Sequence, residues 1–321
     1  MKRVLVTGAG GFIGHQLVSF LKARGYWVRG VDWLEPEYEK TKADEFLVLD
    51  LRRWENCLKA AEGVNQVYNL AANMGGIGFI ETHKAEIVHD NTLINVHMIE
   101  AAKQQGVGEY LYTSSACIYP GYLQNKPDVT PLKEEAAYPA DAEDGYGWEK
   151  LYTERLCRHY REDYGLRTHV VRFHNIFGPL GTYDGGREKS PAAICRKIAL
   201  AKSVDEIEVW GDGLQTRSYC YIDDCVEGIY RLMQSDFYDP INLGQDRMIT
   251  INELVDMVAK IAQKTITRRH DLSKPQGVRG RNSDNTLLRD TLNWEPQISL
   301  EAGLEKTYHW IQSELKKAGR L

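Results

Sequence analysis

The chain has 321 residues, 43% of them hydrophobic, which is enough to bury a core for one large domain and a smaller one. Its formal net charge of −5 argues against a nucleic-acid partner, and its apolar runs are too short for a membrane span. The six cysteines have no metal-ligand spacing and the start of the chain has no signal-peptide pattern, so the composition indicates a soluble cytoplasmic enzyme without a metal.

The amino-terminal segment has the pattern of a dinucleotide-binding turn. An apolar run at residues 4–6 leads into glycines and is followed by a helical stretch at 15–24. Gly8, Gly11 and Gly14 follow the spacing G-x-x-G-x-x-G rather than the commoner G-x-G-x-x-G. A strand, turn and helix of this kind let the backbone approach a pyrophosphate held at the helix N-terminus.

Acidic residues follow the next two apolar runs. Residues 27–31 end in Asp32, eighteen residues past the last of these glycines. A carboxylate there binds a ribose 2′-OH and repels a 2′-phosphate, so we predict NAD rather than NADP as the cofactor. Asp50 and Leu51 follow the strand at 46–49 and are expected to flank the adenine. The alternative, a glycine turn with an incidental aspartate, is disfavoured because strand, turn, helix and acid occur in order.

A tyrosine and a lysine in the middle of the chain have the spacing of a catalytic pair. Tyr146 and Lys150 stand at i and i+4, so on a helix both side chains project from one face. We expect the lysine ammonium to lower the tyrosine pKa, which gives a general base near neutral pH. Ser115 would supply a second hydroxyl to the same substrate oxygen. Taken alone, this spacing is more often found among surface and packing residues.

The order of elements indicates an α/β fold. From residue 1 to about 173, short β-branched runs alternate with helical stretches, as in a doubly wound parallel sheet. After residue 179 the pattern changes, and helices and loops are expected from 245 to 321. The expected elements are a Pro-led helix at 191–201, a strand at 208–210, strands returning to the main sheet at 219–222 and 241–243, and amphipathic helices at 251–261 and 304–315.

Further motifs resemble the extended branch of the short-chain dehydrogenase/reductase superfamily, the sugar-nucleotide epimerases and dehydratases. The matching segments are 69–72, 91, 172–179, 210–217, 221–224 and 242–244. The resemblance implies a Rossmann-type doubly wound parallel sheet with a smaller, discontinuous α/β substrate-binding domain. The NAD-binding domain would comprise residues 1–178 with 218–245, and the nucleotide-sugar-binding domain 179–217 with 246–321.

Four segments are similar to the GDP-mannose 3,5-epimerase family in particular. They are Ala71–Gly78, Ser114–Pro120, Gly185–Pro191 and Arg279–Asn285. This resemblance implies conversion of GDP-D-mannose to GDP-L-galactose, or to GDP-L-gulose by C5 epimerisation alone, through a 4-keto sugar with catalytic NAD, in a homodimer. The first segment usually carries an aspartate where this chain has Asn73. That acid either hydrogen-bonds locally, which makes the change minor, or sets sugar selectivity.

The resemblance also implies catalytic roles. Tyr146 would take the proton of the C4 hydroxyl, Cys117 would be the base for C3 and C5, and Lys189 the opposing acid. Cys117 lies two residues beyond Ser115, so the period of two of a strand would place both on one side. The alternative for Cys117 is a small core residue, and for Lys189 a solvated surface charge.

The remaining contacts implied by the resemblance form two sets. Cofactor contacts are expected from Gly8, Gly11, Phe12, Ile13, Asp32, Asp50, Leu51, Leu70, Ala71, Ala72, Tyr146 and Lys150. Substrate contacts are expected from Gly75, Gly76, Ser115, Ala116, Cys117, Asn175, Lys189, Gln215, Arg217, Arg279 and Arg281. Arginines suit bidentate binding of a pyrophosphate, although Arg279 and Arg281 could also be surface cations.

Two other functions stay open. A GDP-4-keto-6-deoxymannose epimerase-reductase would share the segment around Cys117, but it uses NADPH, which Asp32 disfavours, and it pairs its cysteine with a histidine. A non-catalytic NAD-sensing protein on the same fold is disfavoured because Ser115, Tyr146 and Lys150 are all present.

Overall fold

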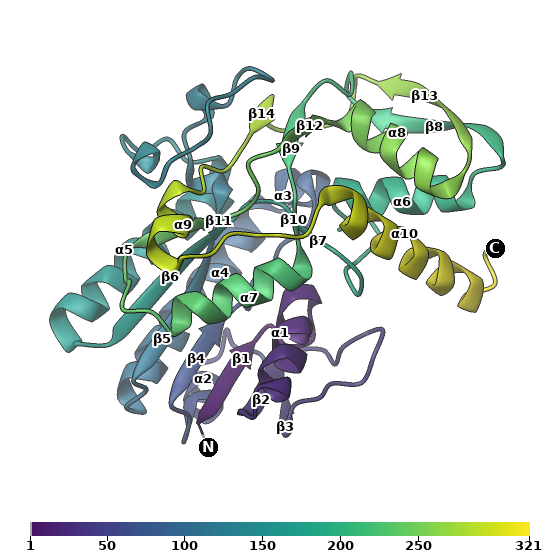
Figure 1. Ribbon diagram of the computed structural model, residues 1–321. Helices are drawn as coiled ribbons and strands as arrows, with labels where there is room; N and C mark the ends of the chain where they lie inside the picture. Colours follow the sequence, from purple (N-terminus) through teal and green to yellow (C-terminus); the bar gives the residue numbers. More distant parts are fainter. Residues whose placement is uncertain (1) are drawn as a thin grey trace.

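A computed structural model describes residues 2–321. Its centre is a seven-stranded sheet in the order β11-β6-β5-β4-β1-β2-β3, in which all neighbouring strands are parallel (Figure 1). The strands are β1 (Arg3–Thr7), β2 (Trp27–Asp32), β3 (Glu45–Val48), β4 (Gln66–Asn69), β5 (Glu109–Ser115), β6 (Arg167–Phe173) and β11 (Pro240–Leu243). The predicted Rossmann-type sheet is therefore confirmed. The strand order reverses between β1 and β4, and ligands bind at such a switch point in open α/β sheets.

Helices cover both faces of this sheet. One face carries α1 (Phe12–Ala23) and α7 (Ile222–Met233), and the other carries α2 (Trp54–Ala61), α4 (Lys84–Gln104) and α5 (Asp144–Tyr164) (Figure 1). In β1, Val4 and Val6 belong to the core cluster under the first face, whereas Leu5 belongs to the cluster under the second. This alternation follows from the period of two of a strand that is buried on both faces.

The turn between β1 and α1 is shorter than the sequence pattern suggested. The helix begins at Phe12 rather than near residue 15, because Gly11 already serves as its N-cap. The backbone N–H of Gly11 donates to the carbonyl of Gly8 at 3.1 Å, and Gly8 has a φ of 69°, which favours glycine. The helix therefore points its N-terminus at the carboxyl edge of the sheet.

Beyond the sheet lies a second region built on α6 (Ser190–Leu200), α8 (Ile251–Ala262) and α10 (Leu300–Lys317), which pack on one another (Figure 1). Strands β8 (Val204–Trp210) and β13 (Thr265–Asp271) pair in parallel beside these helices. The sequence reading missed β13, where it expected helices and loops. Its burial alternates but its inward positions are only half-buried, so it has a weak hydrophobic pattern.

Short strands join the two regions. The expected strand at 219–222 does not return to the main sheet; β10 (Cys220–Tyr221) pairs only with β7 (Ile176–Phe177). A third sheet has the order β12 (Met248–Thr250), β9 (Thr216–Ser218) and β14 (Gly280–Arg281). Its register places Arg281 directly opposite Arg217. The remaining helices are α3 (Ile77–Thr82), α9 (Thr286–Leu292) and the 3-10 turns Ala116–Ile118, Gly121–Leu123 and Glu134–Ala137.

Within residues 2–321, no helix combines the length and the apolar composition needed to cross a membrane.

Candidate active site

A cavity of about 870 Å³ lies between the carboxyl edge of the main sheet and the second region. Every residue predicted for the cofactor, the substrate or catalysis lines this cavity, with the exception of Arg279. Arg279 instead pairs with the carboxylate of Asp212 at 2.9 Å and donates to the side chain of Gln276 at 3.2 Å. The contact of Arg279 with the substrate therefore stays a prediction, since its guanidinium binds these two partners, of which Gln276 lines the cavity.

One end of the cavity is formed by the glycine turn and Asp32. One carboxylate oxygen of Asp32 accepts the N–H groups of Trp33 at 2.7 Å and Leu34 at 3.3 Å, and the other accepts that of Gly10 at 3.0 Å. Burial raises the pKa of Asp32 in spite of these hydrogen bonds. A carboxylate has about four acceptor positions, so one remains for a ribose hydroxyl. A Cβ on Gly10 would lie 2.2 Å from the carbonyl oxygen of Leu34, so only glycine fits there.

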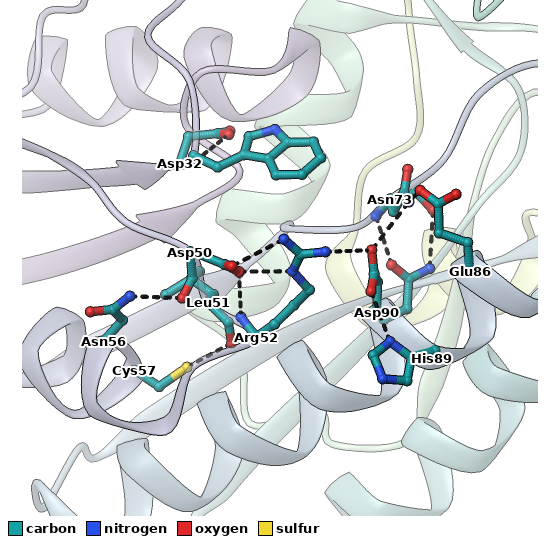
Figure 2. A network of polar contacts seen from close by, with 12 residues as sticks. Asp32, Asp50, Leu51, Arg52, Asn56, Cys57, Asn73, Glu86, His89 and Asp90 are labelled. Carbon is teal, nitrogen blue, oxygen red and sulfur yellow. Dashed lines mark hydrogen bonds and ion pairs between the residues drawn. The ribbon is translucent and has the colours of Figure 1, made fainter.

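Asp50 lies beside this end of the cavity and is bound by Arg52 (Figure 2). The guanidinium donates to both carboxylate oxygens, at 2.9 and 3.0 Å, and this contact lowers the pKa of Asp50. Arg52 also donates to Asp90 at 3.0 Å. Sequence reasoning did not include Arg52 or Asp90, although both line the cavity. Arg52 comes two residues after Asp50, but its link to a residue 38 positions further along depends on the fold.

Tyr146 and Lys150 lie on the first turns of α5, as their spacing predicted. The Lys150 ammonium donates to the carbonyl of Thr113 at 3.1 Å and lies 5.7 Å from the centroid of the Tyr146 ring. Burial raises the pKa of Tyr146 and lowers that of Lys150. The expectation of a lowered tyrosine pKa is therefore wrong for the protein alone, because loss of hydration raises the pKa most and the neighbouring Cys117 and Glu149 raise it further. The tyrosine hydroxyl also interacts with Ser115, as expected for two hydroxyls on one substrate oxygen.

Cys117 reaches the cavity by a different route from the one expected. Strand β5 ends at Ser115, and Cys117 lies in the 3-10 turn Ala116–Ile118 that follows. The Ser115 hydroxyl caps this turn by accepting the N–H of Cys117 at 3.2 Å. The argument from a strand period of two was therefore wrong, although both side chains do line the cavity. The other five cysteines are buried, whereas Cys117 is half-buried.

Arg281 and Glu143 determine the charge around the thiol. Arg281 donates to the sulfur of Cys117 at 3.4 Å and to the side-chain carbonyl of Gln124 at 2.7 Å. Its guanidinium also forms an ion pair with the Glu143 carboxylate, with 2.8 Å between nitrogen and oxygen. Burial and the Glu143 carboxylate raise the pKa of Cys117 and outweigh Arg281, so the resting group is a thiol. Burial alone would raise the pKa of Glu143, but the ion pair with Arg281 outweighs burial and lowers this pKa below its usual range.

Sequence reasoning missed Glu143. It is the N-cap of α5, three residues before Tyr146, and its N–H donates to the carbonyl of Cys117 at 2.8 Å. Its position immediately before the Tyr-Lys helix was the only available signal, because its partner Arg281 is far along the chain.

Lys189 enters the cavity from a loop that precedes α6. Gly185 and Gly186 have φ values of 90° and 88°, which favour glycine and let the loop turn back toward the sheet. The N–H of Gly76 donates to the carbonyl of Arg187 at 3.0 Å, and a Cβ on Gly76 would lie 2.5 Å from the carbonyl oxygen of Glu188. Lys189 is an exposed residue, but enclosure of its ammonium by the cavity walls lowers its pKa.

The far end of the cavity carries Gln215 and Arg217. Burial and the neighbouring charge of Arg281 lower the pKa of Arg217 to about 10. Gln215 donates to the carbonyl of Trp210 at 3.1 Å, while its buried side-chain oxygen has no partner among the described residues. Asn175 has a φ of 44° and donates to the carbonyl of Ser218 at 3.0 Å. This end therefore offers a cation and an unused acceptor to a ligand.

Comparison with known proteins agrees with this geometry. The model of the NAD dependent epimerase/dehydratase family matches residues 4–244. The chain belongs to this family. GDP-mannose 3,5-epimerase from Arabidopsis thaliana is 49% identical over 317 residues, which are 98% of this chain and 83% of that protein. GDP-mannose 3,5-epimerase 1 from Oryza sativa subsp. japonica is 48% identical with the same coverage. The crystal structure of UDP-glucose 4-epimerase with UDP-glucose from Thermotoga maritima has a TM-score of 0.89 at 26% identity and covers 98% of this chain and 99% of that one.

Membership of the NAD dependent epimerase/dehydratase family identifies the enzyme class and the cofactor that the cavity must hold. The residues present fit NAD. The turn of Gly8, Gly10 and Gly11 leaves room for a pyrophosphate beside the start of α1, and Asp32 keeps one acceptor position for a ribose hydroxyl. The carboxylate also disfavours a 2′-phosphate at the same place.

Proposed function

We propose that the chain is a GDP-mannose 3,5-epimerase, converting GDP-D-mannose to GDP-L-galactose and, by epimerisation at C5 alone, to GDP-L-gulose. The observation that carries the proposal is that Cys117, in contact with Arg281, lines the same cavity as Lys189 and the pair Tyr146 and Lys150. With NAD as the hydride acceptor, oxidation at C4 needs only the tyrosine and lysine. Epimerisation at neighbouring carbons needs a further base and acid, and two relatives that share about half of the sequence carry that activity in their names.

In the oxidation at C4, Tyr146 is the general base. The glycine turn and Asp32 would hold NAD, which would supply the hydride acceptor for C4 and the hydride that is given back at the end of the turnover. Tyr146 accepts the proton of the C4 hydroxyl, and Ser115 orients the same oxygen. Because burial raises the pKa of Tyr146, proton transfer needs a compensating charge. The Lys150 ammonium, 5.7 Å from the ring centroid, stabilises the phenolate.

The 4-keto sugar acidifies the hydrogens on C3 and C5, and the chain provides a base and an acid for them. Cys117 removes a proton as a thiolate that Arg281 stabilises at 3.4 Å. Lys189 delivers a proton to the opposite face, for which its lowered pKa is suitable because the ammonium gives up its proton more readily. The charge of Cys117 in turn favours the protonated form of Lys189, so the two groups titrate as a pair.

The second region holds the nucleotide sugar in this proposal. We assign NAD binding to residues 1–178 with 218–245, and nucleotide-sugar binding to residues 179–217 with 246–321. Support comes from Arg217 and Arg281, which stand opposite each other in the β9–β14 register at the end of the cavity away from the glycine turn. The Arg217 guanidinium suits a diphosphate, and the charge of Arg281 lies nearby.

We also propose that the enzyme acts as a cytoplasmic homodimer. Trp148 and Tyr152, one turn apart on α5, leave 49% and 53% of their surfaces exposed, and large aromatic side chains are enriched at interfaces. Light scattering coupled to size exclusion measures the mass of the assembly and so tests the dimer directly.

The cysteines support the proposed compartment. Among residues 2–321 all six cysteines are free thiols, which suits a reducing compartment.

The test is incubation of the purified protein with GDP-mannose, followed by NMR of the products. We expect GDP-L-galactose and GDP-L-gulose without net consumption of the NAD that the protein carries. Tyr146→Phe is the matched control, because it should retain NAD but form no product. Failure of the wild-type protein to change GDP-mannose, with NAD bound, would contradict the proposed substrate.

A further inference from the structure

Asn73 stands at the centre of a polar network at the edge of the cavity (Figure 2). Its side-chain N–H groups donate to the carboxylates of Glu86 at 3.0 Å and Asp90 at 3.4 Å. Its side-chain oxygen accepts from the guanidinium of Arg187 at 3.2 Å. An ionised carboxylate has no hydrogen to donate, so an ionised aspartate at this position could not make both kinds of contact.

Asp90 extends this network to the cofactor end of the cavity. Its side chain is buried, and the oxygen that faces Asn73 also accepts from Arg52 at 3.0 Å. Arg52 holds both carboxylate oxygens of Asp50, the residue expected beside the adenine. Figure 2 shows Arg52 between the two carboxylates. One guanidinium therefore connects Asp50 to the Asp90–Asn73 contact.

Arg187 extends the network in the opposite direction, to the loop that carries Lys189. Its guanidinium also donates to the carbonyl of Met74 at 3.3 Å and lies 3.9 Å from the centroid of the Phe79 ring. Its own carbonyl accepts the N–H of Gly76 at 3.0 Å. Arg187 is two residues before Lys189, so these contacts fix the loop from which the lysine enters the cavity.

We propose that Asn73 and Asp90 are a pair of positioning residues that couple NAD binding near Asp50 to the placement of Lys189. The function of Lys189 in this statement rests on the proposed epimerase activity. In this pair, residue 90 carries a negative charge that binds Arg52, and residue 73 carries a neutral amide. An aspartate at 73 would lie beside the carboxylates of both Glu86 and Asp90, whereas exchanging residues 73 and 90 returns this cluster to two carboxylates and one amide.

The test compares Asn73→Asp, Asp90→Asn and the exchanged double variant with the wild-type enzyme. Each single variant should raise KM for GDP-mannose and lower kcat, each by roughly 10-fold, within the range of couplings between contacting residues. NAD retention after extended dialysis should fall in both. The double variant should regain part of all three quantities, because it restores the number of charges and the amide but not the contact with Glu86. Glu86→Gln is the matched control, since it alters the other carboxylate bound by Asn73 without touching the link to Arg52, and it should behave as wild type.

A pH profile separates this role from a general loss of packing. The charged and titratable groups that face residue 73 and residue 90 are Arg52, Glu86, His89 and Arg187. In Asn73→Asp, protonation of one of the three neighbouring carboxylates at 73, 86 and 90 reduces the repulsion, so activity relative to wild type should rise as the pH is lowered. In a variant damaged only in packing, the ratio of its activity to that of the wild type would stay constant across pH.

Three outcomes would contradict the proposed positioning role of Asn73 and Asp90. They are a double variant no better than the worse single variant, a Glu86→Gln control with the same losses, and an activity ratio to wild type that is constant across pH. NAD retention does not depend on turnover. If wild-type protein failed to convert GDP-mannose, the proposed function would fail while the retention data still tested the pair.

Discussion

Replacement of Cys117 by alanine should separate the epimerisation step from oxidation at C4. The loss of a general base lowers a rate by about 10²–10⁴-fold, which corresponds to about 3–5.5 kcal/mol of barrier. The cost to folding should be smaller, because the lost contact is one hydrogen bond from a charged donor, about 1.5–3 kcal/mol at most. Arg281 keeps Gln124 at 2.7 Å and Glu143 at 2.8 Å, so no buried charge is left unpaired.

The assay is incorporation of deuterium from D₂O into GDP-mannose, followed by NMR at C3 and C5. Wild-type enzyme should place deuterium at both carbons. The Cys117→Ala variant should still oxidise C4, because Tyr146 and Lys150 are unchanged, but its exchange at C3 and C5 should fall by the factor above. Exchange by the wild type should rise with pH, since burial and Glu143 raise the pKa of Cys117 and the thiolate forms only toward higher pH.

A second cysteine supplies the control for this experiment. Cys57 lies on α2, where it is buried in the core outside the cavity, so Cys57→Ala should lower stability but leave deuterium exchange at the wild-type rate. Exchange by Cys117→Ala at the wild-type rate would refute the reasoning. The cysteine would then be a packing residue, and another group in the cavity would be the base.

Three further predictions concern the cofactor site, the hydride step and the fold. Tyr146→Phe should lower turnover by about 10²–10⁴-fold while NAD remains bound, as judged by cofactor released on denaturation. Asp32→Ala should relax the preference for NAD over NADP in binding titrations; an unchanged preference would remove Asp32 from the ribose site. Glu154→Ala should destabilise the protein by about 3–5 kcal/mol in urea unfolding, because it leaves the guanidinium of Arg172 buried without the carboxylate that now binds it at 2.7 and 2.9 Å. A loss below about 1 kcal/mol would mean that water reaches this arginine.

The main sheet was predictable because its strands and helices carry strong local signals. The run before Gly8 and the run before Asp32 are β1 and β2, and both are buried on two faces, as strands inside a parallel sheet covered by helices are. The short strands that join the two regions were not predictable. Tyr219 to Ile222 reads as a central strand, yet β10 pairs only with β7, and nothing local distinguishes the two pairings. Strand β13 was missed because its exposed side chains give a polar pattern.

The candidate site was predictable where function depends on spacing along the chain. Tyr146 and Lys150 stand on one helix, and the glycine turn and its following aspartate occur in order, so their meeting at one cavity needs only the fold class. Contacts between distant segments could not be predicted. Arg281 meets Cys117 across 164 positions, and Arg187 meets Asn73 across 114. Spacing therefore could not distinguish Arg279, which binds Asp212, from Arg281, which reaches the thiol.

The position of Arg281 explains how one cavity can hold a resting thiol and still use a thiolate. Its guanidinium contacts both Cys117 and Glu143, so it balances one negative charge on either of them. In the resting protein that charge lies on Glu143, whose pKa is held low, and the proton stays on sulfur, whose pKa is raised. When the thiol gives up its proton to solvent toward higher pH, the cation that stabilises the thiolate is already in contact, so little reorganisation is needed. Arg217, opposite Arg281 in the register, remains available for the anionic part of a nucleotide sugar.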